Sequence, residues 1–145
     1  MKIIFVCTGN TCRSPVAEGI MKKIISDSGI DAKVCSRGIC VIEGSGVSTL
    51  SVISAMEYGA DISEHVPLQL SQEDFVDADY VFTMTLNHKK FIMSHFPEYK
   101  NIIYSISEFC DIDDISDPFG GDKALYAMCA AQINNACKII TEKVF

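Results

Sequence analysis

The sequence has no tryptophan, no internal repeat and no apolar run of the length that crosses a membrane. After Lys2 only five apolar residues follow in succession, Ile3 to Cys7, which is too short for the core of a signal peptide. We therefore expect a cytoplasmic protein without a membrane partner. The seven cysteines are odd in number and irregular in spacing, so we expect thiols rather than a disulfide framework.

Positive charge is scarce as well. The 145 residues carry a formal net charge of −7, and the only two arginines are Arg13 and Arg37. A chain of this charge has no general attraction for nucleic acid or anionic lipid, so we expect no nucleic-acid partner. An anionic substrate would need a local positive site, which makes the position of Arg13 in the chain informative.

The apolar pattern predicts one domain over residues 1–145. Hydrophobic residues make up 48% of the chain, enough for one compact core. A continuous apolar run with β-branched members predicts a strand buried on both faces at residues 2–7, and further strands are predicted at residues 32–38, 78–85 and 101–106. Helices are predicted at residues 15–29, 48–59, 87–96 and 123–145. This alternation predicts an α/β fold, a doubly wound sandwich in which a four-stranded parallel sheet carries helices on both faces.

Local signals indicate where two of these helices begin. Ser14 is predicted to cap the first helix, with Pro15 at its first position and Glu18 in its first turn, and Asp122 is predicted to cap the last.

Ligands of parallel sheets bind beyond the carboxyl ends of the strands. Segments 7–13, 36–46 and 107–121 leave those ends, so we expect them to line one crevice.

The segment from Cys7 to Arg13 suits attack on a phosphate group. Its backbone N–H groups and the following helix N-terminus can form a nest for an anion, and together with Arg13 they favour a thiolate at Cys7. Arg13 can hold two phosphate oxygens while the thiolate attacks in line. The alternative, a buried strand cysteine and a surface arginine, does not explain why Gly9, Asn10, Arg13, Ser14 and Pro15 occur together.

Residues 6–18, VCTGNTCRSPVAE, resemble the N-terminal signature of the low-molecular-weight protein tyrosine phosphatase family. Residues 117–122, DPFGGD, resemble its second motif, and the order and separation of the two motifs agree. The resemblance extends over the whole chain. It implies a hydrolase without metal or cofactor, which dephosphorylates protein substrates through a phosphocysteine intermediate.

The resemblance also implies roles for single residues. Cys7 is the nucleophile, Arg13 and the amides of residues 8–13 hold the phosphoryl oxygens, and Asp117 is the general acid and then the base for water. Several carboxylates crowd residues 111–117, and only the match to Asp-Pro-Phe selects Asp117. The implied substrate-binding residues are Thr8, Gly9, Asn10, Thr11, Cys12, Ser14 and Phe119.

Further residues are implied to support this loop. Asn10 is expected in a left-handed conformation, with Ser36 and His65 in a hydrogen-bond network around it. Without the resemblance, His65 would be interpreted as a surface loop residue. Cys12 is expected to protect an oxidised Cys7 through a reversible disulfide, and the alternative is a small apolar filler.

Thr11 bears on the choice of substrate. Most tyrosine phosphatases of the family resemble one another in having an aliphatic residue here, whereas threonine resembles the bacterial protein-arginine phosphatases. A hydroxyl offers a partner to a phosphorylated guanidinium, whose donors an aliphatic wall would leave unpaired. We expect Phe119 to pack on the guanidinium, residues 39–41 to form the opposite wall, and Arg37 to lie near the rim.

Phosphoarginine is the predicted substrate, and phosphotyrosine is the nearest alternative. Arsenate reductase shares the fold but needs further cysteines near residues 79–90, where none occurs. A non-enzymatic phosphate-binding domain would not need Asp117. A zinc site at Cys7 and Cys12 lacks a second pair of ligands.

Overall fold

The computed structural model describes all residues from Met1 to Phe145. Its sheet has four strands, β1 Lys2–Cys7, β2 Lys33–Gly38, β3 Tyr80–Thr83 and β4 Ile103–Ser105. The strand order is β2-β1-β3-β4, and every neighbouring pair is parallel. The predicted α/β fold with a four-stranded parallel sheet is confirmed, and all four carboxyl ends lie at one edge of the sheet.

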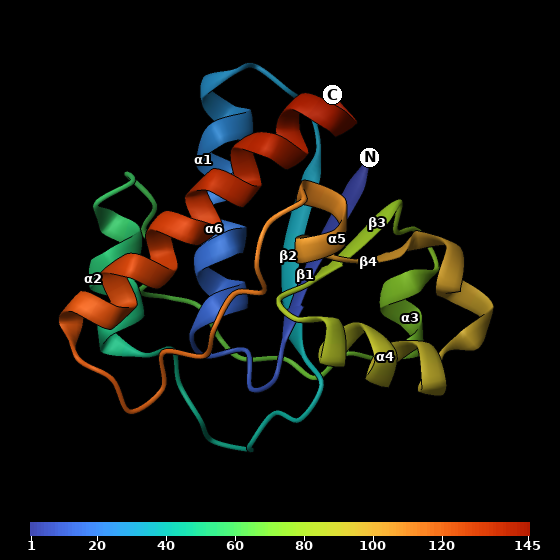
Figure 1. Ribbon diagram of the computed structural model, residues 1–145, viewed down its shortest axis with the longest axis horizontal. Coiled ribbons are helices and arrows are strands. Elements are labelled where there is room, and N and C mark those ends of the chain that lie inside the picture. The colour runs from blue at the N-terminus through green and yellow to red at the C-terminus, as the bar shows by residue number, and fades with distance from the viewer.

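Helices cover both faces of this sheet (Figure 1). On one face lie α1 Arg13–Asp27, α2 Thr49–Met56, α5 Ile106–Cys110 and α6 Lys123–Val144, and on the other lie α3 Gln72–Phe75, α4 Leu86–His95 and the 3₁₀ helix η1 Pro97–Ile102. None of the helices combines the length and apolar character needed to span a membrane.

The side chains of β1 alternate between two cores. Ile3 and Phe5 belong to the larger core under α1 and α6, whereas Ile4 and Val6 belong to the smaller core beside α3 and α4. All four are fully buried. A strand buried on both faces explains why this part of the sequence is continuously apolar rather than alternating.

The start of α1 differs from the prediction. The helix begins at Arg13, so Ser14 lies inside it, Pro15 is its third residue and Glu18 lies beyond the first turn. Ser14 is not the N-cap, because its hydroxyl lies against Cys7 and Asn10 instead. For α6 the predicted cap is confirmed, since Asp122 Oδ1 accepts a hydrogen bond of 3.0 Å from the Leu125 amide.

Three short helices were not predicted from the sequence. They are α3, α5 and η1, each of six residues or fewer. A hydrophobic period of 3.6 cannot be recognised over so few residues. In α3 the capping box that joins Ser71 to Asp74 was the available signal.

Three loops meet beyond the carboxyl ends of the strands. In Figure 1 the loop after β1, the loop between β2 and α2 and the loop before α6 lie on the same side of the molecule. Residues of all three line one pocket of about 280 Å³, which confirms the expected crevice.

Candidate active site

Cys7 ends β1 and Arg13 begins α1, so the intervening loop curls around the base of the pocket. Both side chains are almost fully buried, at 3% and 4% exposure. The pocket is lined by Cys7, Thr8, Gly9, Thr11, Cys12, Arg13, Cys40, Ile42, Asp117 and Phe119. The thiol and the guanidinium therefore share a small space with the carboxylate of Asp117.

The thiol of Cys7 has a hydroxyl neighbour. Its Sγ lies 2.9 Å from Ser14 Oγ, which accepts a hydrogen bond of 2.7 Å from Asn10 Nδ2. Because the amide can only donate, the Ser14 proton remains for Cys7 or for the Arg37 carbonyl, which is farther away at 3.4 Å. The shorter contact is to sulfur, so Ser14 is placed to donate to a thiolate.

Asn10 holds the loop in shape from its centre. Its φ is 57°, the left-handed conformation expected from the sequence. The side chain is fully buried, its Nδ2 donates to Ser36 Oγ at 3.0 Å, and its Oδ1 accepts from the Leu68 amide at 3.0 Å. These bonds offset the cost of the left-handed backbone.

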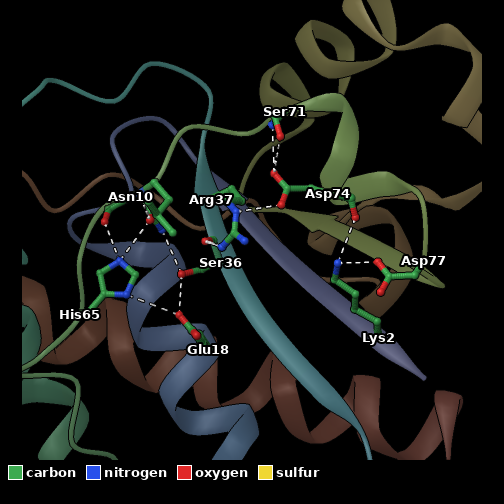
Figure 2. A network of polar contacts seen from close by, with 10 residues as sticks. Lys2, Asn10, Glu18, Ser36, Arg37, His65, Ser71, Asp74 and Asp77 are labelled. Atoms are coloured by element: carbon green, nitrogen blue, oxygen red, sulfur yellow. Dashed lines mark hydrogen bonds and ion pairs between the residues drawn. The ribbon is translucent and has the colours of Figure 1, made fainter.

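His65 completes the network around Asn10 (Figure 2). Its Nε2 lies 3.1 Å from both the backbone oxygen and Oδ1 of Asn10. Both partners are acceptors, so Nε2 carries a proton and donates. The structure thus brings Ser36 and His65 to Asn10 as expected.

Glu18 was missed as a member of this network. Its Oε2 accepts a hydrogen bond of 2.7 Å from Ser36 and lies 3.5 Å from His65 Nδ1, and Lys22 pairs with its other oxygen at 2.8 Å. Burial alone would raise the pKa of Glu18, but hydrogen bonds from His65, Lys22 and Ser36 outweigh it and lower the pKa to about 2. The sequence did not indicate this role for Glu18, because Ser36 and His65, which connect it to Asn10, are distant along the chain.

Arg13 is fixed by the loop before α6. Its guanidinium donates to the Ile115 carbonyl at 2.9 Å and lies 3.7 Å from Asp117 Oδ2. The side chain of Asp117 is about half exposed, and its Oδ1 accepts from the Phe119 amide at 3.1 Å. A carboxylate at the mouth of the pocket beside a buried arginine can reach a leaving group without losing contact with solvent.

The outer walls of the pocket differ in part from the prediction. Thr11 and Phe119 line it as expected, but the wall from the loop after β2 consists of Cys40 and Ile42. Ile39 packs against the smaller core instead. The expectation that residues 39–41 form this wall therefore holds only for Cys40.

Arg37 does not lie at the rim of the pocket. Its Nε pairs with Asp74 at 3.0 Å and another guanidinium nitrogen donates to the Ser36 carbonyl at 2.8 Å. Figure 2 shows this guanidinium directed toward α3. The prediction of a rim cation was wrong, because Asp74 and the Ser36 carbonyl hold the guanidinium and Arg37 does not line the pocket.

His88 is a second residue that the sequence did not indicate. Its Nε2 lies 2.9 Å from Thr8 Oγ1, and its ring is buried in the first turn of α4. Burial, followed by the positive charge of Arg13, lowers the pKa of His88 to about 4. The ring is therefore neutral at neutral pH and steadies the loop next to Cys7 without adding charge.

Cys12 lies at the side of the loop and is a free thiol, as are the other six cysteines. Its Sγ is 3.6 Å from the Thr11 hydroxyl and 3.6 Å from Tyr126 OH. Cys12 lines the same pocket as Cys7. A disulfide between Cys7 and Cys12 stays a prediction.

Comparisons with known proteins agree with this geometry. A family model described as low molecular weight phosphotyrosine protein phosphatase matches residues 2–144. The low molecular weight protein-tyrosine-phosphatase PtpB of Staphylococcus haemolyticus is 42% identical over 134 residues, 92% of this chain and 92% of the relative. The protein-arginine-phosphatase of Bacillus subtilis is 33% identical over 146 residues, 99% of this chain and 97% of the relative.

A solved structure shows the same fold over almost the whole chain. It is a C7S mutant of the YwlE arginine phosphatase with a phosphorylated active-site serine, and it superposes with a TM-score of 0.94 at 32% identity, covering 99% of this chain and 95% of the other. Sequence, fold and the arrangement of cysteine, arginine and aspartate at one pocket lead to one conclusion: the chain belongs to the low molecular weight protein phosphatase family, whose members are cysteine-dependent phosphatases that act on phosphorylated proteins.

Proposed function

We propose that this enzyme hydrolyses phosphoarginine in cytoplasmic protein substrates through a phosphocysteine intermediate. In the first step the Cys7 thiolate attacks phosphorus while the bond to the guanidinium nitrogen breaks. Asp117 gives its proton to the departing nitrogen. Arg13 and the amides of residues 8–13 hold the three phosphoryl oxygens, over which the negative charge of the transition state is spread.

In the second step water releases the phosphate. The Asp117 carboxylate accepts a proton from the water, whose oxygen attacks the phosphocysteine, and the Cys7 thiolate leaves. Ser14 donates to this thiolate, which stabilises it as a leaving group. Inorganic phosphate is then released, and Asp117 is again protonated for the next cycle.

The preference for arginine rests on Thr11. Its side chain lines the pocket that contains Cys7, together with Cys40, Ile42 and Phe119. The hydroxyl is an oxygen acceptor at a position where a phosphoguanidinium presents N–H donors, and the ring of Phe119 can stack on the planar group. The similarity to a Bacillus subtilis protein-arginine-phosphatase supports the same choice.

A phosphotyrosine substrate is the second candidate. The relative with 42% identity carries the name of a protein-tyrosine-phosphatase. The apolar side chains of Ile42 and Phe119 would also accept a phenyl ring. The two candidates share every catalytic residue and differ only in what the walls of the pocket must recognise.

The deciding experiment compares kcat/KM for phosphoarginine and phosphotyrosine peptides of matched sequence. We expect the parent to prefer phosphoarginine and Thr11→Ile to reduce that preference about tenfold, since guanidinium donors lose a partner. Most of the change should be a loss on phosphoarginine. Thr11→Ser, which keeps the oxygen, is the matched control and should retain the preference. A parent that prefers phosphotyrosine would overturn the assignment.

A further inference from the structure

A second pocket adjoins the catalytic pocket, and we call it the side pocket. Its volume is about 400 Å³, and its own walls include Ser45 and Gly46 from the loop after β2 and Tyr126 of α6. It shares five lining residues with the catalytic pocket: Gly9, Thr11, Cys12, Ile42 and Phe119. The two pockets therefore form one continuous surface and meet at these five residues.

The side pocket differs from the catalytic pocket in its chemistry. No charged residue lines it, whereas Arg13 and Asp117 line the catalytic pocket. Ile42 and Phe119 are 73% and 81% exposed. Two large apolar side chains left open to solvent beside a catalytic centre indicate that an apolar group of the substrate covers them.

Ser45 adds a specific polar feature. Its hydroxyl is buried and has no hydrogen-bond partner within the protein. The turn that carries it is closed by a hydrogen bond of 3.1 Å from the Ser45 amide to the Ile42 carbonyl. A buried donor without a partner is unfavourable until a ligand supplies an acceptor, and a peptide carbonyl is such an acceptor.

An extended peptide can place two of its side chains in two adjoining pockets. Residues two positions apart point to the same face of an extended chain and lie roughly 6–7 Å from each other. A peptide whose phosphorylated side chain enters the catalytic pocket therefore directs the side chain two positions away toward the same protein surface. Thr11, Ile42 and Phe119 then lie between the two inserted side chains.

We propose that the side pocket binds an uncharged apolar side chain two positions from the phosphorylated residue of the substrate, with the Ser45 hydroxyl donating to a carbonyl of the same peptide. This inference rests on the proposed function only in that the substrate is a phosphorylated protein. It makes the loop after β2 a determinant of which sites the enzyme dephosphorylates, in addition to the identity of the phosphorylated residue.

The test uses peptides with glycine, leucine, phenylalanine or aspartate two positions before or after the phosphorylated residue. In the parent, leucine or phenylalanine on one of the two sides should raise kcat/KM about tenfold over glycine, because an apolar side chain is buried. Aspartate at the same position should not raise kcat/KM above that of the glycine peptide. Equal kcat/KM for all four residues on both sides would overturn the proposal.

Gly46→Leu fills the side pocket. The backbone of Gly46 is not in the left-handed region, and a Cβ at this position has no neighbour within 4 Å, so a side chain fits without strain. We expect the leucine-to-glycine ratio of kcat/KM to fall to about 1. Because both peptides are measured with the same variant, any general change in turnover cancels in this ratio. Retention of the parental ratio would overturn the proposal.

Two further variants separate a specific effect from a general one. Glu43→Leu places the same side chain at an exposed position of the loop that does not line the side pocket, and it should keep the parental ratio. Ser45→Ala should lower kcat/KM of the leucine peptides about fivefold through loss of one hydrogen bond.

Each peptide series is made with phosphoarginine and with phosphotyrosine. The ratio between the two series reports on the proposed arginine preference, while the dependence on the neighbouring residue within either series reports on the side pocket. The two proposals therefore fail or succeed independently.

Discussion

The carboxylate of Asp117 is the only one in the acidic stretch 111–117 that lines the catalytic pocket. Asp114 instead accepts hydrogen bonds of 3.2 and 3.3 Å from the Leu86 amide at the start of α4. The structure therefore gives the two carboxylates different places: Asp117 lies at the mouth of the pocket, and Asp114 binds the N-terminus of α4. The sequence alone did not make this distinction, because all these carboxylates lie within seven positions.

Asp117→Asn is expected to slow the release of strongly basic leaving groups most, because those groups need a proton as they depart. Rates measured over aryl phosphates with leaving groups of graded pKa should show a steeper dependence in the variant than in the parent. Asp113→Asn, in the same stretch but outside the pocket, is the control and should keep the parental slope. An unchanged slope in Asp117→Asn would mean that another residue is the acid.

At the level of elements, the network of Asn10, Glu18, Ser36 and His65 joins four parts of the chain (Figure 2). Glu18 comes from α1, Ser36 from β2 and His65 from the segment between α2 and α3, while Asn10 comes from the loop between β1 and α1, the catalytic loop. The catalytic loop is therefore held by bonds to elements that the hydrophobic cores already fix.

Glu18→Gln is expected to lower the free energy of unfolding near pH 7 by up to about 3 kcal/mol. The pKa of Glu18 is about 2 when folded and 4.5 at its ordinary value, so its ionised form stabilises the fold fully above pH 4.5. This contribution is lost as the pH falls toward 2. The difference between parent and variant should therefore shrink through that window.

Urea unfolding followed by far-ultraviolet circular dichroism measures this difference, since the chain has no tryptophan to report by fluorescence. Glu142→Gln, an exposed position on α6, is the control and should unfold like the parent at every pH. If the difference in free energy of unfolding between the parent and Glu18→Gln stays constant from pH 7 to pH 2, the carboxylate has no ionic role.

Much of the fold and part of the site could be predicted because their signals are local. The first strand is a continuous apolar run, the other strands alternate with recognisable helices along the chain, and Cys7 to Arg13 is a contiguous motif. Glu18, His88 and Ile42 were not recognised, because each acquires its role from residues brought near by the fold. The start of α1 was misplaced for a related reason, since Ser14 uses its hydroxyl on Cys7 and Asn10 rather than on its own helix.

Across the whole molecule, the seven thiols fall into two groups. Burial raises the pKa of Cys110 to about 11 and that of Cys129 to about 12, and it also raises the pKa values of Cys137 and Cys35. These four thiols stay protonated at neutral pH and react slowly with oxidants. The other three, Cys7, Cys12 and Cys40, all line the catalytic pocket, so oxidation should be confined there.

Mild peroxide is therefore expected to inactivate the enzyme, and a thiol reductant to restore it. The Cys7 thiolate is oxidised to a sulfenic acid, and the Cys12 thiol then condenses with it, which forms a disulfide and releases water. Proteolytic mapping should find Cys7 linked to Cys12.

Cys12→Ala should recover less activity, because the sulfenic acid at Cys7 has no such partner and proceeds to the sulfinic acid. Cys40→Ser, which removes the exposed thiol of the same pocket, is the control and should recover like the parent. If Cys12→Ala recovers fully while Cys40→Ser does not, the protecting thiol is Cys40 and the predicted pairing is wrong.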